Sequence, residues 1–319
     1  MKILITGGAG FIGSHLAERL LEEGHQVSII DNLSTGRLEN IESIKDNGNF
    51  HYTIGSVLNR ELMGKLLASV DQVYHLAAAV GVKYIIENPL LSLKTNIVGT
   101  DNVLELANKH KAKVLITSTS EIYGKSEKVP FSEDDDRLLG STRISRWGYS
   151  DSKAIDEFMA LAYFREKRLP VVIVRCFNTV GPRQTGQYGM VLPKFIKAAL
   201  LDQPLIVYGS GKQTRCFADV SDVVGAFIKL MNTPECQGEI FNVGTTESIS
   251  IEELAKKVKT MCGSKSRIEH MSYEEAFEEG FEDMMNRMPD LGKINQYIGY
   301  EPNYNLDAII QRMIDYYEN

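Results

Sequence analysis

Short apolar runs alternate with amphipathic helical segments from the N-terminus to about residue 177. The pattern predicts buried strands at residues 2–5, 26–30, 50–54, 72–76, 114–116 and 171–175. It predicts helices at residues 11–21, 61–67, 89–110 and 149–168. Such alternation is typical of right-handed βαβ crossovers, which build a parallel sheet. The sequence therefore predicts an α/β fold with a Rossmann-type, doubly wound parallel sheet.

The pattern changes after residue 177. Helices at 192–201, 221–231, 251–261 and 306–317 are predicted around strands at 205–208 and 239–243. No repeat or long flexible linker separates this part from the first, so a smaller C-terminal substrate lobe is expected to be interleaved with the larger one. The predicted Rossmann domain comprises residues 1–177 and roughly 212–245, and the lobe comprises roughly 178–211 and 246–319. The polar stretch 124–146, which holds an acidic run at 133–136, is expected to be a solvated loop.

A glycine-rich turn joins the first predicted strand to the first predicted helix. Gly7, Gly10 and Gly13 fit a GxxGxxG spacing, and Gly8 with the last two fits GxGxxG. A strand, a glycine turn and a helix present free backbone N–H groups at a helix N-terminus, which is a site for a pair of phosphates. This context predicts a dinucleotide-binding site.

The second predicted strand ends at Asp31, followed by a polar turn that can wrap an adenosine. A carboxylate at this place accepts hydrogen bonds from the adenosine ribose and repels a 2′-phosphate, which favours NAD over NADP. Arg37 lies close enough in sequence to leave NADP as an alternative. Small residues after the fourth strand, Ala77 and Ala78, would let a cofactor backbone lie close.

Composition narrows the classes of partner. The 319 residues are 43% apolar and 24% charged, which is ordinary for a globular protein. A net charge of −7 without any basic run argues against a nucleic-acid partner. Four cysteines without a CxxC pair and six scattered histidines argue against a disulfide framework or a metal site. No apolar segment reaches transmembrane length and the chain starts on a strand, so we expect a cytoplasmic enzyme without membrane contact.

A YxxxK motif places Tyr149 and Lys153 on one face of a predicted helix. A phenol with a pKa of about 10 is a poor base. A neighbouring ammonium, together with a positive nicotinamide, would favour the phenolate and make it a base for a sugar or alcohol hydroxyl. The motif follows a Ser/Thr cluster at 117–120 that ends the fifth strand, where ligands of such sheets gather.

These motifs together resemble the extended short-chain dehydrogenase/reductase family, specifically its nucleotide-sugar epimerases, dehydratases and decarboxylases. The resemblance covers almost the whole chain, including TGGAGFIGSH at 6–15, HLAA at 75–78, STSEIYG at 118–124 and QTR at 213–215. It implies a bound NAD that oxidises a hexose at C4. In that scheme Tyr149 takes the hydroxyl proton, Lys153 holds the nicotinamide ribose, and Thr119 hydrogen-bonds the C4 oxygen.

The resemblance also implies two sets of binding residues. The cofactor set is Gly7, Gly10, Phe11, Ile12, Gly13, Asp31, Asn32, Ser34, Thr35, Gly36, Ser56, Val57, Leu76, Ala77, Ala78, Asn96, Ser118, Tyr149 and Lys153. The nucleotide-sugar set is Ser120, Asn178, Arg183, Leu192, Lys194, Val207, Tyr208, Arg215 and Arg287, with Asn178 and Arg215 around the diphosphate and Leu192, Lys194, Val207 and Tyr208 around the nucleobase. Ser56 departs from the family, which usually carries an aspartate facing adenine. By analogy the helices 89–110 and 149–168 would form the interface of a homodimer.

The reaction that follows C4 oxidation depends on the residues after Thr119. Simple 4-epimerases generally lack a carboxylate there, and 4,6-dehydratases carry Thr-Asp-Glu, whereas this chain carries Ser120 and Glu121. Thr-Ser-Glu is similar to UDP-glucuronate decarboxylases, which also carry an Arg-x-Pro motif like that at Arg287. Arg287 could bind the carboxylate or donate a proton, and Glu121 could orient the sugar or water. The favoured hypothesis is a UDP-glucuronate decarboxylase.

Three alternatives remain open at this stage. The first is a 4-epimerase of UDP-glucose or UDP-glucuronate. The second is a dehydratase that works across C5 and C6 with Glu121 as the C5 base. The third is a non-catalytic NAD-sensing protein, which the intact Tyr149 and Lys153 pair disfavours.

Overall fold

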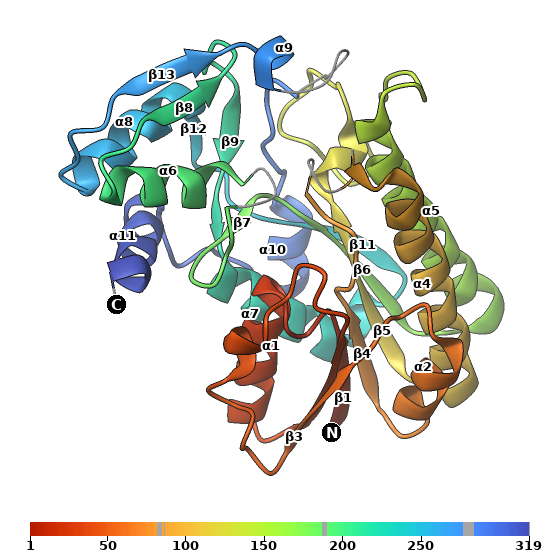
Figure 1. Cartoon of the computed structure of the whole chain (residues 1–319). Coiled ribbons are helices and arrows are strands. Elements are labelled where there is room, and N and C mark those ends of the chain that lie inside the picture. The colour runs from red at the N-terminus through yellow and green to blue at the C-terminus, as the bar shows by residue number, and fades with distance from the viewer. Residues whose placement is uncertain (82–84, 86, 187–189, 277–283, 319) are drawn as a thin grey trace.

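A seven-stranded parallel sheet forms the centre of the larger lobe in the computed structural model, which describes residues 1–81, 85, 87–186, 190–276 and 284–318 (Figure 1). Its strands are β1 (Lys2–Thr6), β2 (Gln26–Asp31), β3 (Phe50–Ile54), β4 (Gln72–His75), β5 (Lys113–Thr119), β6 (Val171–Cys176) and β11 (Glu239–Val243). The strand order is β11-β6-β5-β4-β1-β2-β3. From β1 the chain adds β2 and β3 on one side, and then β4, β5, β6 and β11 on the other side, so the switch point lies between β1 and β4. This order is that of a doubly wound Rossmann sheet, so the predicted fold class is confirmed.

Helices cover both faces of this sheet. One face carries α1 (Phe11–Glu22), α7 (Val220–Asn232) and α10 (Gly292–Ile298), and the other carries α2 (Arg60–Leu67), α4 (Pro89–His110) and α5 (Ser145–Lys167). Successive strand residues point to opposite faces, so Ile3 and Ile5 pack with α1 whereas Leu4 packs with α2 and α4. Burial on both faces explains why these strands are continuous apolar runs.

The smaller lobe lies at the carboxyl ends of the strands and has its own apolar core (Figure 1). Its elements are α6 (Val191–Leu200), β8 (Leu205–Tyr208), β9 (Thr214–Cys216), β12 (Ser248–Ser250), α8 (Ile251–Met261), β13 (Ile268–Met271), α9 (Tyr273–Ala276) and α11 (Leu306–Glu318). Two-residue strands β7 (Thr179–Val180) and β10 (Ala218–Asp219) pair near its base, and short 3₁₀ helices occur at η1 (Leu38–Ile41), η2 (Ser120–Tyr123) and η3 (Pro234–Cys236). Ser250 and Glu253 form a capping box that starts α8.

The contacts between elements differ from the predicted lobe boundaries in two places. Strand β9 pairs antiparallel with β12, so its residues pack with the smaller lobe although they were expected in the Rossmann domain. Helix α10 places Ile294 in the core of the larger lobe, and Tyr300 joins it there. Both differences arise from pairings between segments that are far apart in sequence.

The stretch 124–146 is not simply a solvated loop as expected. Phe131 is fully buried and Glu133 is 8% exposed, although Asp134 and Asp136 are exposed. The backbone of Phe131 forms a short parallel bridge with the segment around Pro289. Pairing with that distant segment draws the first part of the acidic run into the core.

Among the residues that the structure describes, no helix has the length and apolarity needed to cross a membrane. The same residues contain no group of three or more His, Cys, Asp or Glu side chains arranged to hold a metal ion.

Candidate active site

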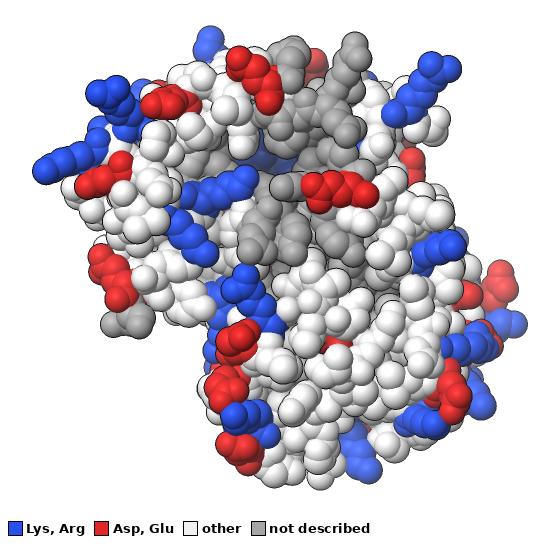
Figure 2. Space-filling model, viewed as in Figure 1, with Lys and Arg blue, Asp and Glu red and all other residues white. Residues whose placement is uncertain are grey.

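A cavity of about 1020 Å³ lies between the two lobes, at the carboxyl ends of the central strands. Figure 2 shows this hollow in the face of the molecule, with lysine and arginine side chains along one side. The larger lobe lines it with the ends of β1, β4, β5 and β6, and the smaller lobe with α6 and β8. The cavity is at the switch point of the sheet, which is where open α/β sheets bind ligands.

The glycine turn forms one wall of the cavity. Gly7 has φ +73°, and a Cβ there would lie 2.9 Å from the backbone nitrogen of Ala77. A Cβ on Gly13 would lie 2.3 Å from the carbonyl oxygen of Gly7, so close packing of α1 against the turn requires glycine. Helix α1 starts after Gly10 without a capping side chain, which leaves its first N–H groups for a ligand. This wall fits a dinucleotide diphosphate.

Asp31 ends β2 at the rim of this wall. Its Oδ2 accepts a hydrogen bond from the Ala9 N–H at 3.0 Å, and its Oδ1 accepts one from the Leu33 N–H at 2.8 Å. Burial raises the pKa of Asp31 above its usual range, while these N–H groups act in the opposite direction. A Cβ on Gly36 would lie 2.8 Å from both carboxylate oxygens, so glycine at that position makes room for Asp31.

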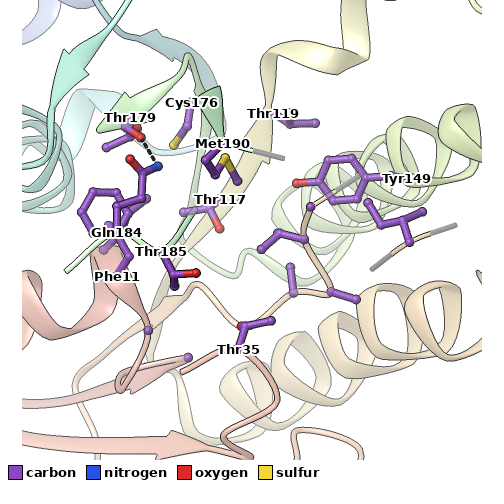
Figure 3. A pocket seen from close by; sticks show the side chains of 18 of the residues that line it. Phe11, Thr35, Thr117, Thr119, Tyr149, Cys176, Thr179, Gln184, Thr185 and Met190 are labelled. Carbon is purple, nitrogen blue, oxygen red and sulfur yellow. Dashed lines mark hydrogen bonds between the residues drawn. The ribbon is translucent and has the colours of Figure 1, made fainter. Parts of the chain in front are cut away.

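Thr119 and Tyr149 meet on the opposite wall, near the end of β5 (Figure 3). Figure 3 shows the Tyr149 ring projecting from α5 with its hydroxyl toward the cavity interior, and Thr117 and Cys176 pointing into the same space. Thr119 and Tyr149 are joined by a hydrogen bond. The Thr119 hydroxyl also accepts a hydrogen bond from the Glu121 N–H at 3.2 Å, which starts the 3₁₀ helix η2. The pair forms a polar point suited to binding one substrate oxygen.

Lys153, which the motif places one turn from Tyr149, has a carboxylate partner in the same helix. Its ammonium is buried and donates to Asp156 Oδ2 at 2.6 Å, so its charge is already balanced by a carboxylate one turn further along α5. Burial, and next the negative charge of Glu121, raise the pKa of Tyr149 above its ordinary value. Both effects favour the neutral phenol over the phenolate in the protein alone.

Arg287 reaches the same end of the cavity from the C-terminal part of the chain. Its Nη2 donates to Ser120 Oγ at 2.6 Å, and its Nη1 lies 3.7 Å from Glu121 Oε1. The backbone next to it is fixed, because Phe131 donates its N–H to the Met288 carbonyl at 2.8 Å. The Thr-Ser-Glu and Arg-x-Pro motifs, which are far apart in sequence, are thus brought together in space.

Most of the predicted binding residues line the cavity. Those of the cofactor set that do so are Gly7, Gly10, Phe11, Ile12, Gly13, Asp31, Asn32, Ser34, Thr35, Ser56, Val57, Leu76, Ala77, Ala78, Ser118, Tyr149 and Lys153. Those of the substrate set are Asn178, Arg183, Leu192, Lys194, Tyr208, Arg215 and Arg287. The roles of these residues stay predictions, but their convergence on one space is a property of the fold.

Four predicted residues do not line the cavity. Val207 is fully buried in the core of the smaller lobe, and its neighbour Ile206 lines the cavity instead, because strand residues alternate between faces. Asn96 is 1% exposed and accepts a hydrogen bond from the Ala79 N–H at 2.9 Å, which fixes the loop after β4. Ser120 is buried under Arg287, and Gly36 lies behind Asp31. We interpret these four as supports of the cavity wall.

Several basic and amide groups line the part of the cavity next to the smaller lobe. Arg183 donates to Ser14 Oγ at 3.2 Å and to Glu18 at 2.7 Å, which ties its guanidinium to α1. Asn178 donates to the Cys216 carbonyl at 3.0 Å. Arg215, Lys194 and Tyr208 lie in the same region, and the Lys194 ammonium is 5.9 Å from the centre of the Tyr208 ring. This concentration of positive charge suits an anionic ligand although the chain is acidic overall.

Arg146 lines the cavity, although none of the sequence motifs marked it as a site residue. It lies one helical turn before Tyr149, is 6% exposed, and places Nη2 at 3.7 Å from Glu121 Oε1. The sequence predicted that this helix starts at Tyr149, which would place Arg146 in the preceding loop. In the structure, α5 starts at Ser145 and includes Arg146. The signal available in the sequence was a basic residue three positions before the tyrosine, on the same helix face.

Comparisons with known proteins agree with this architecture. The family model described as GDP-mannose 4,6 dehydratase matches residues 4–313. The UDP-N-acetyl-α-D-glucosaminuronate decarboxylase of Bacillus cytotoxicus is 44% identical over 317 residues, which cover 99% of this chain and 97% of that protein. The UDP-glucuronic acid decarboxylase 1 of Xenopus tropicalis is 38% identical over 318 residues, which cover 99% of this chain and 72% of that protein.

A solved structure is similar over its whole length. The UDP-glucuronic acid 4-epimerase of Bacillus cereus, in complex with UDP-glucuronic acid and NAD, superposes with a TM-score of 0.90 at 30% identity and covers 100% of this chain and 99% of that one. The chain belongs to the GDP-mannose 4,6-dehydratase family, within the NAD-dependent extended short-chain dehydrogenases/reductases that modify nucleotide sugars.

Proposed function

We propose that this protein is an NAD-dependent decarboxylase of UDP-linked hexuronic acids that acts through a 4-keto intermediate. The observation that carries the proposal is the contact of Arg287 with Ser120 and Glu121, next to Thr119 and Tyr149. The arrangement puts the Arg287 guanidinium beside Thr119 and Tyr149, the pair that would position C4 in the proposed reaction. The names of the relatives at 44% and 38% identity support the same reaction class.

The first step needs a base at C4 and a place for hydride. Bound NAD would accept the hydride from C4 and later return it, and the glycine turn with Asp31 would hold it. Thr119 hydrogen-bonds the C4 oxygen, and Tyr149 takes the hydroxyl proton. Lys153, held in place by Asp156, lies one turn from Tyr149 on the same face of α5, where it can bind the nicotinamide ribose.

The second step follows from the product of the first. With a ketone at C4, the C6 carboxylate belongs to a β-keto acid. The C5–C6 bond breaks, carbon dioxide leaves, and its electron pair moves into the enolate at C4. Thr119 and the Tyr149 hydroxyl then stabilise the enolate oxygen by hydrogen bonds. Arg287 orients the carboxylate before it leaves. A proton delivered to C5 by Arg287, or by a water that Glu121 orients, then gives the 4-keto pentose, which the returning hydride would reduce.

Two hexuronic acids are candidate substrates. UDP-glucuronate is the first, because it is the substrate class that the Thr-Ser-Glu and Arg-x-Pro motifs suggest. Its 2-acetamido analogue is the second, because the relative at 44% identity is named for it. A UDP-glucuronate 4-epimerase is the alternative reaction, favoured by the similarity to the Bacillus cereus structure.

Product analysis separates these reactions. Purified protein is incubated with NAD and either UDP-glucuronate or its 2-acetamido analogue, and the product is identified by mass spectrometry together with a carbon dioxide assay. We expect a UDP-pentose and one carbon dioxide per turnover, and Arg287→Gln should lose this activity. A product of unchanged mass would assign the epimerase, and loss of water would assign a dehydratase.

We also propose a homodimer that forms through α4 and α5. These two helices pack together, and exposed apolar side chains on them include Leu90 (65% exposed), Val98 (46%), Ile155 (40%) and Phe158 (68%). Burying such a surface is favourable, and interfaces between like subunits are rich in apolar residues. Light scattering should give twice the chain mass for the wild type and a monomer for Phe158→Asp. A wild-type monomer would contradict this proposal.

A further inference from the structure

Three charged side chains meet at the inner end of the cavity. Arg146 Nη2 and Arg287 Nη1 each lie 3.7 Å from the same oxygen, Glu121 Oε1. The side chains are 5%, 10% and 14% exposed, in the order Arg146, Arg287 and Glu121, and all three residues line the cavity. Two positive charges therefore stand around one negative charge, at the place where the sugar would react.

Arg146 is a buried cation at the start of a helix. It is the second residue of α5, where the helix N-terminus already carries partial positive charge, so a cation there is disfavoured. Removing a guanidinium from water adds a further cost. Arg143, three residues earlier, is exposed and does not have this cost.

We propose that Arg146 is a second guanidinium for the C6 carboxylate of the substrate, acting together with Arg287. The proposal rests on the proposed function, because it assumes a uronic acid in the cavity. Arg146 comes from the same helix turn as Tyr149, so its place relative to the C4 base is fixed by the backbone. A guanidinium nitrogen of each arginine lies 3.7 Å from Glu121 Oε1, so both guanidiniums approach the same part of the cavity wall. Selectivity for uronic acids over neutral hexoses follows from this pair.

Arg146 should contribute more to binding the substrate carboxylate than to breaking the C5–C6 bond. The substrate carboxylate loses its charge as carbon dioxide forms, so a cation that holds it stabilises the ground state more than the transition state. Removing Arg146 should therefore raise KM and Kd while kcat changes by less than about threefold. A residue with a purely structural role would not separate these quantities according to the charge of the ligand.

The test compares two ligands that differ only at C6. UDP-glucuronate and UDP-glucose are titrated calorimetrically into the NAD-loaded protein in a Tyr149→Phe background, which stops turnover. Arg146→Gln should weaken UDP-glucuronate binding about tenfold or more, as expected for loss of a hydrogen bond to a charged group. UDP-glucose binding should stay within about twofold. The matched control Arg143→Gln removes an exposed charge three residues away and should leave both affinities unchanged.

Two further results decide the proposal. Arg146→Lys keeps one charge but loses the forked geometry, so it should retain part of the preference for UDP-glucuronate; this variant also serves if the glutamine variant does not fold. Equal losses for both ligands, or an unchanged preference in either variant, would overturn the assignment. The carbon dioxide assay on the wild type is separate. If no carbon dioxide is released but the carboxylate preference depends on Arg146, the decarboxylase fails and the carboxylate site stands.

Discussion

Replacing Arg175 by methionine tests how the loop that carries Phe131 is attached to the sheet. Arg175 is 5% exposed on β6 and donates to both carboxylate oxygens of Glu157, at 3.0 and 2.8 Å. It also donates to the Tyr123 hydroxyl at 3.0 Å and to the Glu133 carbonyl at 2.8 Å. Methionine fills a similar volume but leaves the buried Glu157 carboxylate without its cation. The expected loss in the free energy of unfolding is about 3–5 kcal/mol.

The double variant Arg175→Met/Glu157→Leu gives the decisive comparison. It removes both charges of this pair, so it should regain about 2 kcal/mol or more relative to Arg175→Met alone. Unfolding is followed in urea and by calorimetry, and the single variant should lower Tm by roughly 5–8 °C for a chain of 319 residues. Arg19→Met, which breaks an exposed pair with Glu23, is the control and should cost less than about 1 kcal/mol. Losses that simply add would refute the reasoning.

Three further predictions concern single residues of the larger lobe. Burial lowers the pKa of His75 to about 3 from an unfolded value of 6.5, so its stabilising contribution is present above pH 6.5 and is lost as pH falls. Urea titrations below pH 6.5 should show that the free energy of unfolding of the wild type falls by up to about 1.4 kcal/mol per pH unit more than that of His75→Gln. Asp31→Asn should weaken NAD binding about tenfold and reduce discrimination against NADP, measured by fluorescence titration; unchanged discrimination would contradict the ribose contact. Tyr149→Phe should lower kcat by 10²–10⁴, roughly, while UDP-glucuronate still binds, and a variant as active as the wild type would remove Tyr149 from the mechanism.

The larger lobe was predictable because its signals are local. All seven strands of the central sheet were expected, since buried parallel strands are apolar runs bounded by turns. Their bounds agree within one residue, except that β5 extends three residues beyond its predicted end at residue 116. The short strands β7, β9, β10, β12 and β13 were not predicted. Each has two to four residues and exists because it pairs with a distant segment, which leaves no periodic pattern to read.

The candidate site was predictable where a motif fixes spacing along the chain. The glycine turn, Asp31 and the YxxxK pair fall into this class, and all of them line the cavity. Arg146 was missed because its importance depends on where α5 starts and on the approach of Glu121. The effect of burial and of Glu121 on the pKa of Tyr149 was also beyond the motif, because a YxxxK spacing carries no information about burial or about the pairing of Lys153 with Asp156.

The core of the smaller lobe is made from three separate stretches, within 180–217, 249–268 and 304–317. Residues of both lobes line the cavity. A nucleotide sugar that contacts Lys194 or Tyr208 as well as Tyr149 therefore couples the stability of the smaller lobe to that of the larger one. At a hundredfold excess over Kd it adds about 2.7 kcal/mol against any opening that separates them. The rate of amide hydrogen exchange in α8 should therefore fall when the nucleotide sugar binds and change little when NAD binds alone. The substrate would then stabilise the smaller lobe that binds it against opening.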